Sequence, residues 1–260
     1  MQGLASERQL NRAARRCMRR SSAKGADGRS WADYRRDYRM NIQSLSQRLT
    51  SGVWKPGPTR DVRIVTFTGK KMTLSIPTVE DRIVHRALRN LIEPILEERA
   101  FADFVSGFRP GRSRITAVRQ AYAHVATGLT HVADVDVESV SEGASIDEVV
   151  SWVARWIADG SLLSVLRTAL GGLPFPLAPG GGLSPMLLSL RLVPVDQALG
   201  GEPVVRFADN FCVFTPSRPQ AEAAYLRLES ELAKLRLRPS LSKSSVRDTF
   251  NPEDLFLIGG

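Results

Sequence analysis

Apolar and polar residues alternate with two different periods in the first part of the chain. Apolar residues recurring every three to four positions predict helices, and strict alternation predicts strands. Alternation on both sides of Gly69-Lys70-Lys71 predicts a β-hairpin over Val62–Pro77. Helical spacing predicts three helices, the last of them capped by Thr78: Arg8–Arg20, Trp31–Leu49 and Val79–Glu98.

The rest of the chain alternates short apolar runs with longer amphipathic segments. Val132–Val137 is typical of a strand, and Val204–Phe214 of two strands around Ala208-Asp209-Asn210. A closing apolar run, Leu255–Gly260, predicts an exposed sheet edge suited to docking a partner. Helical spacing predicts four further helices: Ile146–Ala158, Leu162–Leu170, Pro185–Leu199 and Gln220–Leu235.

Composition indicates a globular protein. With 260 residues, of which 43% are hydrophobic, the chain is long enough for one large domain or two small ones. The only cysteines, Cys17 and Cys212, are too few for a disulfide scaffold or a thiolate zinc site and favour a reducing compartment. The sequence has neither a signal-peptide core nor an apolar run long enough to cross a membrane. We therefore expect a cytoplasmic protein with no membrane partner.

Positive charge is concentrated near the start of the chain. The net charge is +9, and residues 1–63 hold 15 Lys or Arg against 5 Asp or Glu, which leaves about −1 for the remainder. One basic cluster has helical spacing and few acids to neutralise it, which favours binding to nucleic-acid phosphates over a merely solvated helix face. Its members are Arg12, Arg15, Arg16, Arg19, Arg20 and Lys24.

Acidic residues occur within two of the predicted strand regions. Asp134 and Asp136 lie in the first, and Asp209 lies at the turn of the second. An ionised Asp among apolar strand residues is costly unless a positive group meets it. Two Asp from neighbouring strands, presented at the edge of a sheet, suit a pair of Mg²⁺ ions for phosphoryl or nucleotidyl transfer. Aspartates at strand ends also commonly make turns, so both interpretations stay open at this point.

Several motifs, in order along nearly the whole chain, resemble the reverse transcriptases of bacterial group II introns. The combination and the spacing carry the resemblance, since no motif is specific alone. The motifs are Lys24-Gly-Ala-Asp-Gly28, Ser51-Gly-Val-Trp-Lys-Pro56, Ile76-Pro-Thr-Val-Glu-Asp-Arg-Ile-Val84, Ser106-Gly-Phe-Arg-Pro-Gly-Arg-Ser113, Gly180-Gly-Gly-Leu-Ser-Pro185, Phe207-Ala-Asp-Asn210 and Phe256-Leu-Ile-Gly259.

The resemblance implies an α+β fold built as the fingers and palm of a right-handed polymerase. Residues 1–130 would form the basic N-terminal helices and the fingers, and residues 131–260 the palm, an antiparallel sheet backed by helices. The chain stops where the family's palm ends, so we expect the thumb to be absent. A partner protein or a second protomer would then replace the thumb's hold on the duplex.

The resemblance also assigns roles to individual residues. The family's metal aspartates fall on Asp136 and Asp209, which implies Mg²⁺ or Mn²⁺ as cofactor. Lys243 matches a lysine that protonates the leaving pyrophosphate, a general-acid role. Arg109 and Arg112 match positions that contact the template backbone or brace the fingers, with a structural salt bridge as an equal alternative.

Departures from the family's pattern concentrate where the incoming nucleotide would bind. Asn210 replaces the second acid of the metal turn, which should weaken metal binding. Met72 replaces an arginine that clamps the triphosphate, so that Lys70 is left to steer the triphosphate in part. Pro179 replaces a glutamine. Ser141 replaces an aromatic steric gate, which leaves room for a ribonucleotide.

Two functions are consistent with these residues. The first is RNA-templated nucleotidyl transfer, of the RNA-directed DNA polymerase type, with RNA or an RNA–DNA hybrid as the partner. The second is a catalytically inactive relative that binds RNA or a partner protein within a ribonucleoprotein assembly. Both predict RNA binding with a steep salt dependence. Only the first predicts metal-dependent primer extension that Asp209→Ala abolishes.

Overall fold

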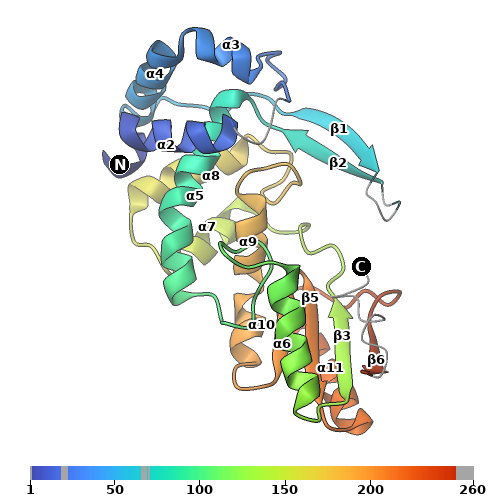
Figure 1. Ribbon diagram of the computed structural model, residues 1–260. Coiled ribbons are helices and arrows are strands. Elements are labelled where there is room, and N and C mark those ends of the chain that lie inside the picture. The colour runs from blue at the N-terminus through green and yellow to red at the C-terminus, as the bar shows by residue number, and fades with distance from the viewer. Residues whose placement is uncertain (1, 19–22, 66–68, 70, 250–260) are drawn as a thin grey trace. The chain divides into compact units, whose positions relative to one another are not determined.

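A computed structural model describes residues 2–18, 23–65, 69 and 71–249 of the chain (Figure 1). The predicted site residues Arg19, Arg20 and Lys70 lie outside these ranges, as does the predicted strand at residues 255–260. Two compact units share the chain. The first combines residues 1–99 with 141–187, and the second combines residues 100–140 with 188–260.

Helices and strands alternate along the described residues. The helices are α1 (Gln2–Ala5), α2 (Glu7–Met18), α3 (Trp31–Arg36), α4 (Tyr38–Thr50), α5 (Val79–Arg99), α6 (Arg114–Ala126), α7 (Ile146–Ala154), α8 (Gly160–Gly171), α9 (Ser184–Arg191), α10 (Val193–Ala198) and α11 (Arg218–Lys234). The strands are β1 (Arg60–Val65), β2 (Lys71–Ile76), β3 (His131–Asp136), β4 (Val204–Phe207), β5 (Asn210–Thr215) and β6 (Ser245–Asp248).

The first unit is organised around α5, which α1 and α2 contact (Figure 1). Helix α5 begins as the sequence predicts, because the Thr78 hydroxyl accepts a hydrogen bond from the Asp81 N–H at 3.1 Å. The predicted hairpin is confirmed as the antiparallel pair β1–β2. Gly180, with φ of +98°, lies so close to Ser75 of β2 that a Cβ would meet its carbonyl oxygen at 2.6 Å.

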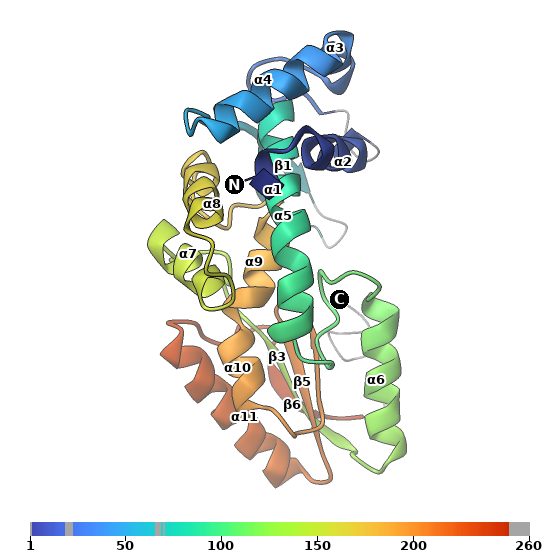
Figure 2. The same cartoon turned by 90° about the vertical axis from the view of Figure 1, so that its left-hand side faces the viewer.

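The second unit contains a four-stranded antiparallel sheet in the order β4-β5-β3-β6. Strand β3 is buried along almost its whole length. Helices α10 and α11 cover one face of the sheet and α6 covers the other (Figure 2). Because side chains alternate along a strand, Val135 contributes to the α11 side, whereas Val132, Asp134 and Asp136 face the side of α6.

The structure differs from the predicted elements at two helix breaks, and it adds helix α6 and strand β6, which the sequence analysis does not predict. The helix predicted over Trp31–Leu49 divides at Asp37, whose φ of −115° and ψ of 38° lie outside the helical region. The helix predicted over Pro185–Leu199 divides at Leu192, and Pro194 lies in the first turn of α10, where its missing N–H costs nothing. No helix within the described ranges is long and apolar enough to span a membrane.

Candidate active site

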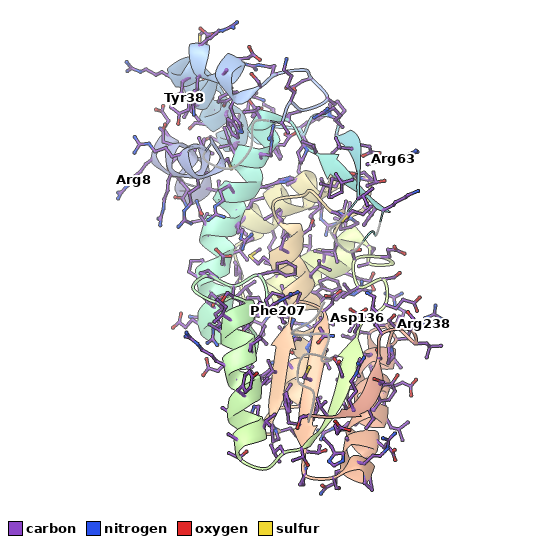
Figure 3. All side chains as sticks on the ribbon, turned by 45° about the vertical axis from the view of Figure 1, so that its right-hand side comes forward. Arg8, Tyr38, Arg63, Asp136, Phe207 and Arg238 are labelled. Atoms are coloured by element: carbon purple, nitrogen blue, oxygen red, sulfur yellow. The ribbon has the colours of Figure 1, made fainter. Side chains whose placement is uncertain are left out.

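Asp136 and Asp209 come together at one end of the four-stranded sheet. Asp136 is the last residue of β3 and pairs in register with Asn210, the first residue of β5. Asp209 precedes Asn210 in the turn between β4 and β5, and its carbonyl oxygen accepts a hydrogen bond from the Val137 N–H at 3.1 Å. Figure 3 shows Asp136 and Phe207 at this same end. The strand of Asp136 and the turn of Asp209 therefore meet at one end of the sheet, as predicted. Asp136 is buried at the end of an inner strand, however, and is not presented to solvent at the sheet's edge.

Lys243 lies beside the first of these acids. Its Nζ donates to Asp136 Oδ1 at 3.1 Å, and the lysine side chain is 41% exposed whereas that of Asp136 is 6% exposed. The loop that carries Lys243 is attached to the same residue, because the Ser240 N–H donates to the Asp136 carbonyl at 2.8 Å and the Asp136 N–H donates to Ser244 Oγ at 3.0 Å. The ammonium group is thereby held at the carboxylate with one side open to solvent.

Asp134 occupies the same face of β3 but is fully buried. Its Oδ2 lies 3.4 Å from Arg247 Nε on β6. Cys212 Sγ lies 3.6 Å from both Asp134 Oδ1 and Asn210 Oδ1, so the thiol links the two side chains. Burial raises the pKa of the Cys212 thiol, and the Asp134 carboxylate raises it further. This enclosure favours a supporting role for Asp134 over direct contact with a metal.

Asn210 is buried, and its Nδ2 atom has no hydrogen-bond partner among the described residues. A buried amide donor without a partner costs about 1–3 kcal/mol. Such a donor is suited to an acceptor that is brought to the site, for example a phosphate oxygen or a water molecule.

The donor set at this end of the sheet fits a hard divalent cation. Asp136 and Asp209 offer carboxylate oxygens from two adjoining backbone segments, and Mg²⁺ is commonly held by one or two carboxylates together with waters and substrate phosphates. Asp136 already binds a cationic group, the Lys243 ammonium. No third carboxylate, His or Cys completes a protein-only metal cage within the described part of the chain, so a bound ion would depend on its substrate for ligands.

The predicted basic cluster lies in the first unit. Arg8, Arg12, Arg15 and Arg16 of α2 line a cavity of about 860 Å³, together with Leu91 of α5. All four arginines are exposed. Lys24 is also exposed and follows in the loop before α3.

The remaining predicted residues have the following surroundings. Arg109 is buried and donates to the carbonyls of Ala102 at 2.6 Å and Val105 at 2.9 Å. Arg112 forms an ion pair with Asp103 at 2.9 Å. Ser141 is half-buried in a turn that belongs to the first unit. Roles in template or nucleotide binding stay predictions for Arg109, Arg112 and Ser141.

Two buried charged residues next to the site were not singled out from the sequence. Arg206 of β4 and Asp196 of α10 form an ion pair with both side chains inaccessible to solvent. The available signal was an arginine within the apolar run Val204–Phe207. A charge in such a run needs a buried partner, but only the fold identifies Asp196 as that partner.

The reverse transcriptase (RNA-dependent DNA polymerase) family matches residues 55–251, which include Asp136, Asp209 and Lys243. Since that is more than half of the chain, the protein belongs to the reverse transcriptase family. Within the family it is similar to the reverse transcriptases of group II introns.

Individual relatives agree with this assignment. Over 193 residues the chain is 31% identical to Protein YkfC of Escherichia coli (strain K12), an alignment covering 67% of this chain and 49% of YkfC. Over 79 residues it is 39% identical to the group II intron-encoded protein LtrA of Lactococcus lactis subsp. cremoris, covering 30% of this chain and 13% of LtrA. The chain thus spans about half the length of YkfC and less of LtrA.

Among solved structures, a chain of the partial Cas6-RT-Cas1–Cas2 complex aligns with a TM-score of 0.45 and 18% sequence identity, over 90% of this chain and 41% of that chain.

Proposed function

We propose that this chain catalyses RNA-templated nucleotidyl transfer of the reverse-transcriptase type. The observation that carries the proposal is the meeting of Asp136, Asp209 and Lys243 at one end of the sheet, where backbone hydrogen bonds connect all three segments. Family membership supports a polymerase reaction, and the carboxylate pair supports a divalent metal, Mg²⁺ or Mn²⁺.

In the proposed reaction the 3′ hydroxyl of a primer attacks the α-phosphorus of a nucleoside triphosphate. A new P–O bond forms between the primer oxygen and the α-phosphorus, the bond from the α-phosphorus to the bridging β-phosphate oxygen breaks, and pyrophosphate leaves. The proton of the 3′ hydroxyl passes to solvent water. A bound divalent cation supplies activation of the hydroxyl and neutralises the developing charge. Asp136 and Asp209 would hold that cation through their carboxylate oxygens. Lys243 donates its Nζ proton to the leaving pyrophosphate, which the exposure of its side chain permits.

Asn210 and Ser141 belong to the nucleotide side of the proposal. The unpartnered Nδ2 of Asn210 would donate to a triphosphate oxygen, so that the neutral residue binds substrate where a second acid would bind metal. Ser141 would admit a ribonucleotide. Lys70 would steer the triphosphate.

We assign residues 131–260, which hold the four-stranded sheet with α10 and α11, to a palm, and residues 1–130, which hold the N-terminal helices and the β1–β2 hairpin, to fingers. Helix α6 packs on the sheet but falls before this division. This division groups the chain differently from the two compact units. The proposed partner is RNA or an RNA–DNA hybrid. A protein partner or second protomer that helps to hold the duplex remains a further prediction.

The test is primer extension on an RNA template, titrated with Mg²⁺ and with Mn²⁺, for the wild-type protein and for Asp209→Ala. We expect Asp209→Ala to lower the rate by about 100-fold or more, because a catalytic metal contributes several kcal/mol to the transition state. The matched control is Asp147→Ala, which removes an exposed aspartate of α7 that pairs with Arg167, and its rate should equal that of the wild type.

Two outcomes would overturn the proposal. One is extension that survives Asp209→Ala, which would mean that the reaction does not use this carboxylate. The other is no extension by the wild type at any metal concentration, accompanied by salt-sensitive RNA binding. That result would leave the catalytically inactive RNA-binding relative as the function.

A further inference from the structure

A buried ion pair lies directly behind the turn that carries Asp209. Arg206 Nε donates to Asp196 Oδ1 at 2.7 Å, and Arg206 Nη2 donates to Asp196 Oδ2 at 2.6 Å. This two-pronged geometry is specific to a guanidinium and a carboxylate. The solvation lost when two charges are buried can exceed their mutual attraction, and apolar residues of similar volume often fill such a space at equal or lower cost. The pair therefore calls for an explanation beyond stability.

The guanidinium also binds two backbone carbonyls. Arg206 Nη1 donates to the Ala208 carbonyl at 2.7 Å, and Nη2 donates to the Ser189 carbonyl at 3.3 Å. Ala208 has φ of +57°, a left-handed conformation that residues with a Cβ rarely adopt. The hydrogen bond from the Arg206 guanidinium thus helps to hold Ala208, the residue just before Asp209, in this unfavourable conformation.

The other side of the turn is closed by the loop at residues 104–107. The Arg206 N–H donates to the Phe104 carbonyl at 2.9 Å, and the Ser106 N–H donates to the Arg206 carbonyl at 2.8 Å. Gly107 lies against Ala208 so closely that a Cβ on it would stand 2.0 Å from the Ala208 nitrogen. The turn is therefore confined between this loop and the Arg206 side chain.

Charge explains why an arginine bonded to an aspartate suits this place. An arginine alone, behind a turn that binds metal cations, would repel those cations through the low-dielectric interior. Asp196 neutralises that charge, and the guanidinium still donates a hydrogen bond to the Ala208 carbonyl. A lysine has three donors on a single nitrogen atom, so it could not make all four of the hydrogen bonds that the guanidinium makes here.

We propose that Arg206 and Asp196 are positioning residues, which fix the Ala208–Asp209 turn so that the Asp209 carboxylate is preorganised for metal binding. The inference rests on the proposed function for its consequence in catalysis, but its structural claim concerns the turn alone. Ligands that are already held in the binding geometry lose little conformational entropy when the metal binds.

The test replaces both charges at once, with Arg206→Met and Asp196→Leu in one protein, because removal of either alone would strand a buried charge. Hydrogen–deuterium exchange is followed in peptides that cover residues 204–211. We expect the turn amides to exchange about tenfold faster or more, which is the loss of one charged hydrogen bond. Peptides from α11 should be unchanged. In primer extension, the Mn²⁺ concentration for half-maximal rate should rise about tenfold with a smaller change in the rate at saturating metal.

The matched control is Arg227→Met with Glu202→Leu. That pair is an ion pair in the same unit, and Arg227 also bonds to the Ala198 carbonyl at the end of α10, the helix of Asp196. No bond from this control pair to the turn is found in the described residues, so its exchange at residues 204–211 and its Mn²⁺ dependence should match the wild type.

Unchanged exchange at the turn in the double variant would overturn the inference, whatever the polymerase assay shows. Faster exchange at the turn, in a protein whose wild type extends no primer, would support the positioning role and contradict the proposed function. If the double variant does not fold, the same exchange measurement is made on Arg206→Lys. This variant keeps a positive charge beside Asp196 but loses the planar guanidinium that binds Asp196 and the Ala208 carbonyl together. Faster exchange at the turn supports the inference, and unchanged exchange contradicts it.

Discussion

Asn210 is the residue at which this site departs most clearly from a two-acid metal turn. Its side chain is neutral and buried, with one oxygen near the Cys212 thiol and a nitrogen without a partner in the described structure. The same thiol lies 3.6 Å from the buried Asp134 carboxylate. An acid at position 210 would therefore add charge for a metal and, at the same time, place two carboxylates on either side of one sulfur atom.

Asn210→Asp should accordingly change metal affinity and stability in opposite directions. We expect Mn²⁺ to bind about three- to tenfold more tightly, because one more carboxylate joins the ligand set. We expect the free energy of unfolding to fall by about 1 kcal/mol, because like charges approach in a buried place. Isothermal titration calorimetry with Mn²⁺ and thermal unfolding measure the two effects.

Gln197→Glu is the matched control, since it adds the same charge to an exposed position at the end of α10. It should leave both quantities near their wild-type values. An Asn210→Asp protein with unchanged Mn²⁺ affinity would show that position 210 does not face the metal.

The sequence predicted some of the site residues but not the partners that they contact. Asp136 and Asp209 stand out because acids interrupt apolar strands within recognisable motifs, and the structure brings their strands together. The partners of Arg206 and Asp134 could not be foreseen, because both bonds join elements whose pairing depends on the fold. A pattern along the chain indicates which residues are unusual, and the tertiary structure decides what each one contacts.

Elements with a strong apolar period were predicted closely. Helix α5 and the β1–β2 hairpin occur where the alternation places them. Helix α6 was missed because it packs on the sheet mainly through Ala117 and Ala121, whose small side chains leave little apolar pattern in the sequence. Strand β6 was missed because its short Ser245–Asp248 segment has no apolar alternation and forms only by pairing with β3.

The first turn of α5 carries a pH dependence. Asp81 accepts hydrogen bonds from the Thr78 hydroxyl at 2.7 Å and from the Gly57 N–H at 3.0 Å. Burial nevertheless raises the pKa of Asp81 from 3.8 to about 6. Between these two values the folded protein keeps the proton and the unfolded chain has lost it, so this residue makes stability fall as pH rises through the interval.

Asp81→Asn should remove that loss. Relative to the wild type, we expect the variant to be similar in stability near pH 4 and more stable by up to about 3 kcal/mol at pH 7.5, from 1.36 kcal/mol for each pKa unit. Chemical denaturation across this range measures the difference. His85 contributes an opposite slope, because burial lowers its pKa to about 4, but its effect cancels between variant and wild type. A difference that stays constant with pH would contradict the prediction.

At the scale of the whole molecule, the positive side chains of α2 and of α11 have different surroundings. The chain carries a net charge of +9. In the first unit, exposed arginines surround the cavity beside α2. In the second unit, cations on α11 are paired with acids: Arg218 with Glu222, Arg227 with Glu202 and Lys234 with Glu231. For the proposed RNA binding, an explanation based on net charge and one based on the cavity beside α2 therefore make different predictions.

Two variants with the same loss of net charge separate these explanations. Arg12→Gln, Arg15→Gln and Arg16→Gln together remove three charges from the cavity, whereas Arg218→Gln, Arg227→Gln and Lys234→Gln remove three paired charges from α11. We expect the first variant to lower the slope of log K for RNA against log salt concentration by about 2 to 3, because each phosphate contact contributes about 0.7–0.9. The second variant should lower it by much less, since its cations already have partners. Fluorescence anisotropy with labelled single-stranded RNA measures both slopes. Equal losses in the two variants would mean that net charge, and not the arginines of α2, governs binding.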